Sequence, residues 1–423
     1  MRLITTTALA LVAAVSAFPA AAQYNSAPPQ LPPQVPANQQ SANQPPAQAQ
    51  STVRPSSKAF KAIVDLQDSV KKSDFASVPA KVAAAQAVAT TKDDRYVIAR
   101  LQLDAAIAAK DNAGMAAAID AIAASGYLDA AKSGGLYAGL GGTFLNDKHY
   151  PEAAAAYRKA LSLTPNDSEA QRLLGVALFS AGQKADAATA FQRMIQTSLA
   201  AGQKPSEDTY RLAVQSAFDA KLPQANDIAR QWLAAYPSAD SWRNSIAVYR
   251  ALNQPDVEGT LDLLRLMQAT GAMNQASDYG RFARAAVEQN NYNEAQAVLD
   301  AGIAAKVVDP ANPEFSSLVN GLKARPKATT ADLAEATRSA QSGMALLHIG
   351  DRYYAMANYA KAVELYRMAM GKPGVDAAVA NLHIGMALAR AGDKAGATTA
   401  LNAVTGPRAD IAKFWLTYVN QKA

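Results

Sequence analysis

A motif that returns about every 34 residues constrains this 423-residue chain more than any other feature. In the clearest copy, Leu140-Gly141 is followed by Ala153, Tyr157 and Pro165. The next copy repeats the pattern at Leu174-Gly175, Ala187 and Phe191. Residues three or four apart share one face of a helix, so each copy predicts two helices. The small residues allow those two helices to approach closely, and the aromatic residue fills the space between them.

The register continues to the end of the chain, with residues that match the motif less well in the middle. Strong copies return at Ile349-Gly350, with Tyr366, and at Ile384-Gly385. Weaker copies occur at Leu212-Ala213, Ile246-Ala247 and Phe282-Ala283. A single helix pair leaves one apolar face uncovered, so the units must stack. The alanine-rich composition also favours helix. The sequence therefore predicts an all-α repeat fold.

These Leu-Gly pairs, the spaced small and aromatic residues and Pro165 resemble the tetratricopeptide repeat (TPR) family. The resemblance implies an α-solenoid of stacked helix-turn-helix repeats that forms a right-handed superhelix. It also implies an inner groove made mainly by the first helix of each pair. Because such arrays bind many unrelated ligands, the resemblance predicts a mode of action and does not name a partner.

The predicted organisation has six parts. They are a signal peptide (1–22), a Pro/Gln-rich disordered linker (23–57), degenerate helical repeats (58–133), TPR repeats (134–309), a degenerate repeat (310–342), and TPR repeats with a C-terminal capping helix (343–423). Within the first degenerate region, we expect helices over Arg95–Lys110 and Asn112–Ser125. The last helix is expected over Ala409–Asn420, where Phe414, Trp415 and Tyr418 should cover the final repeat.

The first residues have the pattern of an export signal. Arg2 precedes the apolar run Leu3–Phe18, and small residues then lead to a predicted cleavage between Ala22 and Gln23. The run is short for a membrane span, although an uncleaved anchor is the alternative. The sequence contains no cysteine, which suits an oxidising compartment because unpaired thiols are a liability there. We therefore expect a periplasmic or secreted protein with no integral membrane span after cleavage.

The linker cannot form a helix because its prolines lack the backbone donor and clash with the preceding turn. It is expected to remain extended. A flexible spacer is the simpler interpretation, and a ligand for a proline-binding module is the alternative.

Residues that could carry catalysis or bind a metal are few. There is no cysteine, and the three histidines include His348 and His383, which are one repeat apart and so occupy the same structural position twice. We expect structural roles for both, and a solvated turn around His149. Gly139–Gly142 lie in a helical register, where glycine serves close packing rather than phosphate binding. We predict no catalytic residues, no metal site and no cofactor.

The net charge of +6 and the pI near 9.2 raise the question of nucleic-acid binding. No dense basic run accompanies them, and the best cluster is Lys323-Ala324-Arg325-Pro326-Lys327. We interpret this cluster as a solvated inter-helix loop, with contact to an anionic envelope surface as the alternative. No nucleic-acid partner is expected.

The predicted groove supplies the candidate binding residues. Inward positions on first helices lie three or four residues apart. They mix aromatic, charged and amide side chains, namely Arg172, Phe179, Tyr210, Phe218, Asn244, Arg284, Asp351, Tyr354 and Arg390. Aromatic residues and arginines suit a protein or peptide ligand. No unit shows a repeated charged clamp for a C-terminal carboxylate.

We therefore predict an exported, non-catalytic scaffold that binds protein partners through this groove. The first alternative is an accessory subunit for envelope polysaccharide assembly or export, with glycan machinery as its partner. The second is an enzyme whose site lies between repeats.

Overall fold

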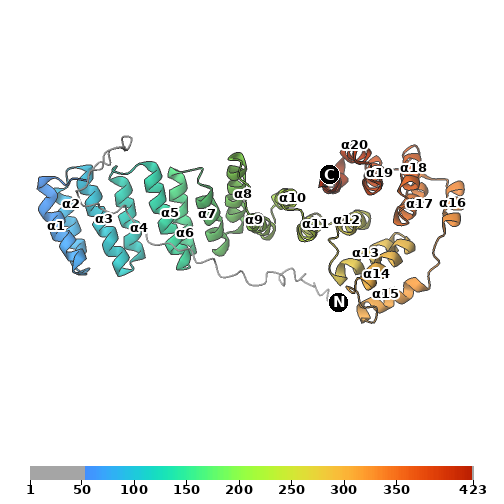
Figure 1. The fold of residues 1–423 in the computed structure, drawn as a ribbon, viewed down its shortest axis with the longest axis horizontal. Helices are drawn as coiled ribbons and strands as arrows, with labels where there is room; N and C mark the ends of the chain where they lie inside the picture. The colour runs from blue at the N-terminus through green and yellow to red at the C-terminus, as the bar shows by residue number, and fades with distance from the viewer. Residues whose placement is uncertain (1–52, 422–423) are drawn as a thin grey trace, which may run out of the picture. The chain divides into compact units, whose positions relative to one another are not determined.

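The computed structural model describes residues 53–421. The predicted signal peptide, its cleavage site and most of the predicted linker lie outside this range. Over the described residues, the chain forms twenty-one α-helices and no strand, as expected for an all-α repeat protein (Figure 1). The chain divides into two compact units, and the boundary in the sequence lies between Thr197 and Ser198. We call them unit 1 and unit 2.

Unit 1 is a row of antiparallel helix pairs, in which α1 packs on α2, α3 on α4 and α5 on α6. The helices are α1 (Ser57–Lys71), α2 (Val78–Val88), α3 (Lys92–Ala109), α4 (Asn112–Ala124), α5 (Ala130–Asn146), α6 (Tyr150–Leu163), α7 (Ser168–Ser180) and α8 (Lys184–Ala200). The two helices expected in the degenerate region are confirmed as α3 and α4, to within three residues at each end.

The start of α3 shows how polar side chains define the helix ends. The Thr91 hydroxyl accepts a hydrogen bond from the Asp94 N–H at 3.0 Å, and the Asp94 carboxylate accepts one from the Thr91 N–H at 3.0 Å. Asp94 also accepts hydrogen bonds from Ser56, which caps α1. Burial alone would raise the pKa of Asp94, but the donors of Ser56, Thr90 and Thr91 outweigh it and hold the pKa well below its usual range. One carboxylate therefore joins two helix starts.

Close packing of glycine against a ring explains the repeated Leu-Gly pair. A Cβ atom on Gly141 would lie 2.9 Å from the Tyr157 ring, and one on Gly175 would lie 2.7 Å from the Phe191 ring. In unit 2, a Cβ atom on Gly350 would lie 2.5 Å from the Tyr366 ring. The predicted role of these glycines in helix approach is confirmed. Gly139–Gly142 lie inside α5, as their register indicates.

Unit 2 continues the helix pairs. The helices are α9 (Glu207–Asp219), α10 (Gln224–Ala235), α11 (Ala239–Asn253), α12 (Val257–Ala269), α13 (Ala276–Glu288), α14 (Tyr292–Ala304), α15 (Pro313–Lys323), α16 (Thr330–Ser339), α17 (Gly343–Ala355), α18 (Tyr359–Met370), α19 (Ala377–Ala391), α20 (Lys394–Asn402) and α21 (Ala409–Gln421), with a 3-10 turn η2 (Gly406–Arg408) before α21. The span 310–342 thus contains the pair α15 and α16.

Unit 2 wraps around one helix. Every residue from Leu261 to Met267 in α12 is buried, so this helix is covered on all sides over about two turns. Helix α21 packs on α19 and α20, as expected, and it also packs on α12. Its Phe414 ring lies 5.7 Å from the Tyr249 ring of α11, and Gln421 donates to the Leu233 carbonyl of α10 at 3.0 Å. The end of unit 2 therefore returns to its early helices (Figure 1).

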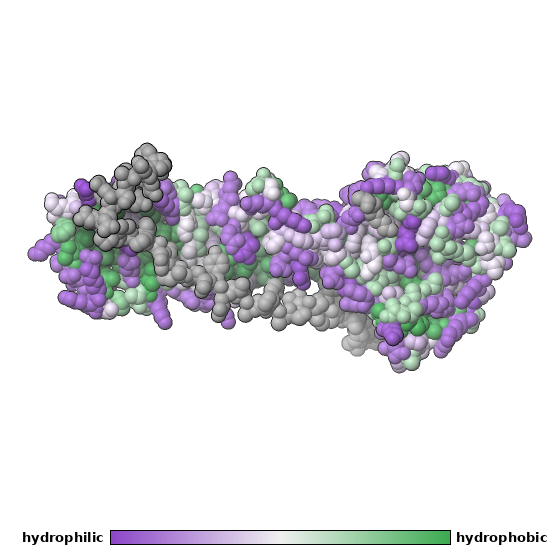
Figure 2. Space-filling view, in the orientation of Figure 1, coloured by the Kyte–Doolittle hydropathy of each residue, from purple (hydrophilic) through white to green (hydrophobic). Residues whose placement is uncertain are grey.

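Within the described range, none of the helices combines the length and the apolarity that a bilayer crossing requires. Hydrophilic residues are spread over the visible face of both units (Figure 2).

Two glycines of α5 provide a test of the packing argument. Gly141→Ala places a methyl group against the buried Tyr157 ring and should lower the free energy of unfolding by about 1–3 kcal/mol. Gly135→Ala, in the same helix, meets no atom within 4 Å and should raise it by about 0.5–1 kcal/mol. Urea unfolding followed by circular dichroism measures both. Equal effects of the two substitutions would contradict the predicted close approach.

Candidate functional site

In unit 1, the predicted groove residues Arg172 and Phe179 lie on α7 and are partly exposed. The Arg172 guanidinium pairs with Glu169, 2.6 Å from its carboxylate. The Lys184 ammonium lies 3.2 Å from the centre of the Phe179 ring. Val176 lies between them on the same stripe of α7 and is also partly exposed.

The predicted residues of unit 2 separate into two sets. Asn244 and Arg284 are exposed, Phe218 is partly exposed, and Tyr210 is 2% exposed. Arg284 lies 3.7 Å from the Glu314 carboxylate.

The second set is Asp351, Tyr354 and Arg390, which face other side chains of unit 2. Arg390 donates to the Tyr359 hydroxyl at 3.3 Å, and the other two belong to the cluster described next.

A cluster of charged side chains surrounds α12, and Arg265 is at its centre. This side chain is 2% exposed. Its Nε and Nη2 atoms each donate to one Glu294 oxygen of α14 at 2.8 Å, which is a bidentate pair. Its Nη1 atom lies 3.3 Å from Asp262 and 3.6 Å from Asp351 of α17. Arg265 also lies over the Tyr354 ring, 5.2 Å from its centre. We call Asp262, Arg265, Glu294, Asp351 and His383 the buried charge cluster.

His383 of α19 completes the cluster between two carboxylates. Its Nδ1 atom lies 3.1 Å from Asp351 and its Nε2 atom 3.3 Å from Asp262, although neither contact has the angle of a good hydrogen bond. Glu258 lies 4.0 Å from Nε2. Burial alone would lower the pKa of His383, but Asp351 and Asp262 outweigh it and hold the pKa well above its usual value. The two carboxylates therefore favour the protonated imidazolium form of His383.

The charges of the cluster explain why that proton stays. Three buried carboxylates face Arg265 and His383, so the cluster keeps a net negative charge even with His383 protonated. Burial would raise the pKa of Asp351, but His383 and Arg265, helped by the Tyr366 hydroxyl that donates at 2.8 Å, hold it well below its usual range. Cations and carboxylates thus stabilise each other's charged forms.

The edge of the cluster reaches a cavity of about 660 Å³. Arg408 of η2 donates to both oxygens of Asp256, at 2.8 and 2.9 Å, and to Glu258 at 3.0 Å. Its guanidinium crosses α12 where Gly259 has no side chain. Burial raises the pKa of Glu258 above its usual value. Glu258 therefore stands between the cavity and the buried His383.

This arrangement is an electrostatic crosslink of α12 to α14, α17 and α19. The described residues contain no group of three or more histidines and carboxylates placed to hold a metal ion. Instead, the carboxylates are used in pairing with arginine and histidine. The expected structural role of His383 agrees with its complete burial. Repeat periodicity did not identify Arg265 and Asp262, although two charges within the otherwise apolar run Leu261–Met267 are a signal in themselves.

Residues 140–203 match the family model of the tetratricopeptide repeat. The glycine-to-ring packing of that segment recurs at Gly350 and Tyr366, far from the match. Residues 140–203 therefore form a tetratricopeptide-repeat segment within the all-α chain.

Several solved structures resemble this chain weakly. The Naa15/Naa10 complex bound to HypK-THB has a TM-score of 0.36 at 12% identity, covering 86% of this chain and 65% of that chain. The TPR2AB domain of yeast Sti1, in its complex with pHSP90, has a TM-score of 0.25 at 12% identity, covering 68% and 98%. A tetratricopeptide repeat protein from Parabacteroides merdae has a TM-score of 0.23 at 11% identity, covering 79% and 100%. Structural similarity at these TM-scores gives no information about what this chain binds. No curated protein matches the sequence.

Removal of the central cation tests the crosslink in unit 2. Arg265→Met leaves Glu294, Asp262 and Asp351 without their shared partner in a buried site, and should lower the free energy of unfolding by about 3–5 kcal/mol. The exposed pair of Arg158 with Asp186 is the control, since Arg158→Ala should cost less than about 1 kcal/mol. Denaturant unfolding measures both changes. Similar losses from the two substitutions would show that the cluster does not hold unit 2 together.

His383 should also make stability depend on pH. Because its pKa is raised in the folded state, its contribution is complete below the unfolded pKa of about 6.5 and is lost as the pH rises through the folded pKa. Stability relative to His383→Gln should therefore decline as the pH is raised above about 6.5. Urea titrations of both proteins from acid to alkaline pH measure the difference. A difference that stays constant or grows with pH would contradict the imidazolium assignment.

Proposed function

We propose that this chain is an exported scaffold that binds protein partners through exposed faces of its repeats. The observation that carries the proposal is the stripe Arg172, Val176 and Phe179 on α7. These three residues occupy one face of a first helix and all are partly exposed. Arginine and aromatic side chains supply much of the binding energy in protein interfaces. Stacked repeats present such stripes on a rigid support.

The exposed residues Asn244 and Arg284 extend the proposed binding surface within unit 2. Asp351 and Tyr354 contribute less, because their side chains are already occupied by Arg265 and His383. Export remains a proposal that rests on the sequence of residues 1–22.

Partner capture tests the α7 stripe. In cells that express the tagged full chain, Phe179→Ala should reduce crosslinked partner by about tenfold, since truncation of a central interface residue often costs more than 1 kcal/mol. Arg172→Glu should reduce it by less, because Arg172 already pairs with Glu169. Arg193→Glu, an exposed arginine of α8, is the matched control and should leave recovery unchanged. Mass spectrometry of the crosslinked material measures recovery. Equal recovery from all variants would exclude the stripe, while enrichment of glycan enzymes alone would favour the envelope polysaccharide role.

Localisation is tested separately. We expect the mature chain in the periplasmic or secreted fraction, with Gln23 as its first residue, because small residues precede this position. N-terminal sequencing of the fractionated protein measures this. A chain that keeps Met1 in the cytoplasmic fraction would contradict export.

A further inference from the structure

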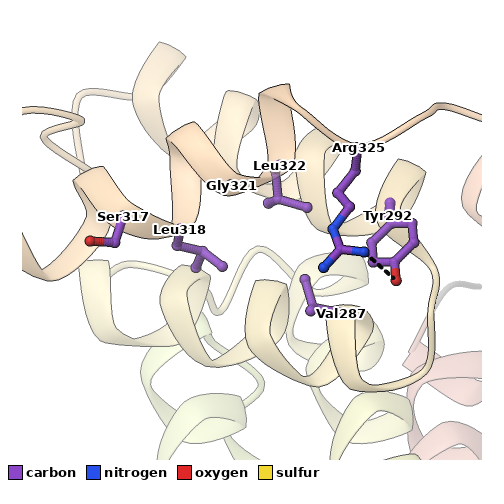
Figure 3. Close-up of a pocket in the computed structure, with 7 residues that line it drawn as sticks. All are labelled: Val287, Tyr292, Ser317, Leu318, Gly321, Leu322 and Arg325. Carbon is purple, nitrogen blue, oxygen red and sulfur yellow. Dashed lines mark hydrogen bonds between the residues drawn. The ribbon is translucent and has the colours of Figure 1, made fainter.

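A small pocket with one apolar wall and one polar end lies between α13, α14 and α15 in unit 2 (Figure 3). Val287 at the end of α13 and Leu318 and Leu322 of α15 form its apolar wall, and Tyr292 lies at the end nearest Arg325. Its volume is about 130 Å³. Since an apolar cavity of about 150 Å³ holds one benzene molecule, this pocket has room for one aliphatic side chain. None of the nine predicted groove residues lines it.

The pocket is open along α15 because one of its lining residues is glycine. A Cβ atom on Gly321 would meet no atom within 4 Å. A side chain at this position would therefore enter free space instead of a packed core. Apolar residues are visible on the surface over α13–α15, with hydrophilic residues on either side (Figure 2).

A positive charge stands at the mouth of the pocket. The Arg325 guanidinium lies 5.1 Å from the centre of the Tyr292 ring, with Nη1 3.5 Å from the Tyr292 hydroxyl (Figure 3). Within the described part of the chain, no carboxylate forms an ion pair with Arg325, and the exposed Lys323 and Lys327 also have none. Arg325 lines the pocket, and Lys323 and Lys327 lie two residues before and after it in the chain.

The loop that carries these charges is held in place. The Asn293 side chain of α14 donates to the Ala328 carbonyl at 2.9 Å and accepts from the Ala328 N–H at 3.1 Å. These two hydrogen bonds fix the loop after Arg325 against the start of α14. A fixed cationic loop loses less conformational entropy on binding than a free one.

We propose that this pocket binds a peptide segment of a partner protein in which an aliphatic side chain lies beside a carboxylate. The aliphatic side chain enters between Val287 and Leu322, and the carboxylate pairs with Arg325. The proposal rests on the proposed function as a scaffold and names the chemistry of one partner. A lipid acyl chain is much longer than one side chain and exceeds the volume of the pocket.

Defined peptides measure this binding to the purified chain. The probe is a fluorescent ten-residue Gly/Ser peptide with blocked ends and a central Asp-Leu-Asp. Three comparison peptides carry Asn-Leu-Asn, Asp-Ser-Asp, or Asn-Leu with a free C-terminal carboxylate. Fluorescence anisotropy should show that Asp-Leu-Asp binds about fivefold more tightly than the first two, because an exposed ion pair contributes at most about 1 kcal/mol. The fourth peptide tests the source of the carboxylate. It should bind no more tightly than Asn-Leu-Asn, and tighter binding would overturn the assignment to a side-chain carboxylate.

Two substitutions locate the binding. Arg325→Glu should weaken Asp-Leu-Asp binding by at least about tenfold, because it places a carboxylate against a carboxylate. Gly321→Leu should weaken it similarly, because it fills the pocket from α15 without a clash at Cβ. Arg193→Glu in α8 is the charge-matched control and should not change binding. Thermal unfolding verifies that each variant is folded.

The outcomes separate this proposal from the scaffold function. Absence of Asp-Leu-Asp binding to the wild-type chain, or binding that survives both Arg325→Glu and Gly321→Leu, would overturn the pocket. If partner capture in cells still depends on Phe179 in that case, the scaffold function stands without the pocket. If the wild-type chain captures no partner but binds Asp-Leu-Asp through Arg325, the pocket stands and the scaffold function fails.

Discussion

A helix pair of this repeat cannot bury both of its apolar faces, and each unit meets that constraint in its own way. In unit 1, successive pairs stack, and glycines such as Gly141 and Gly175 let an aromatic ring of the second helix lie against the first. In unit 2, the chain returns on itself, so that α12 is covered by α21 as well as by its sequence neighbours. Stacking leaves one side of α7 partly exposed, whereas the return in unit 2 covers α12 on all sides over Leu261–Met267.

The packing of other helices around α12 involves charged as well as apolar contacts. A helix buried on all sides has no route to water for Asp262 and Arg265, so their partners must come from the helices that cover it. Glu294, Asp351 and His383 supply those partners from α14, α17 and α19. Leucine tolerates a small slip between helices, but a bidentate arginine pair does not, because both N–H groups must meet both oxygens. The cluster thus joins α12 to α14, α17 and α19 through directional contacts.

Contacts within one helix pair could be predicted from the sequence, and contacts across the unit could not. Gly141 and Tyr157 lie on the two helices of one pair, α5 and α6, so the repeat motif itself places them together. Arg408 and Asp256 are 152 residues apart, and Gln421 and Leu233 are 188 apart. Repeat periodicity contains no information about such pairs. For the same reason, the repeat register identifies Asp351 as a first-helix position. It does not reveal that the Asp351 carboxylate forms ion pairs with Arg265 and His383. The pocket at Arg325 also depends on three helices that meet only in the folded chain.

The two exposed arginine sites differ in what a carboxylate ligand would gain there. Arg172 is already paired with Glu169, so an acidic ligand on α7 exchanges one surface ion pair for another. Because a surface ion pair contributes at most about 1 kcal/mol, that exchange leaves little net energy, and the Phe179 ring must supply most of the binding. The Arg325 guanidinium instead lies over the Tyr292 ring, which carries no negative charge. The positive charge of Arg325 therefore has no carboxylate partner among the described residues. A carboxylate that arrives there makes a new ion pair beside the apolar wall of the pocket. Charge should therefore select ligands at α15, and apolar contact should select them at α7.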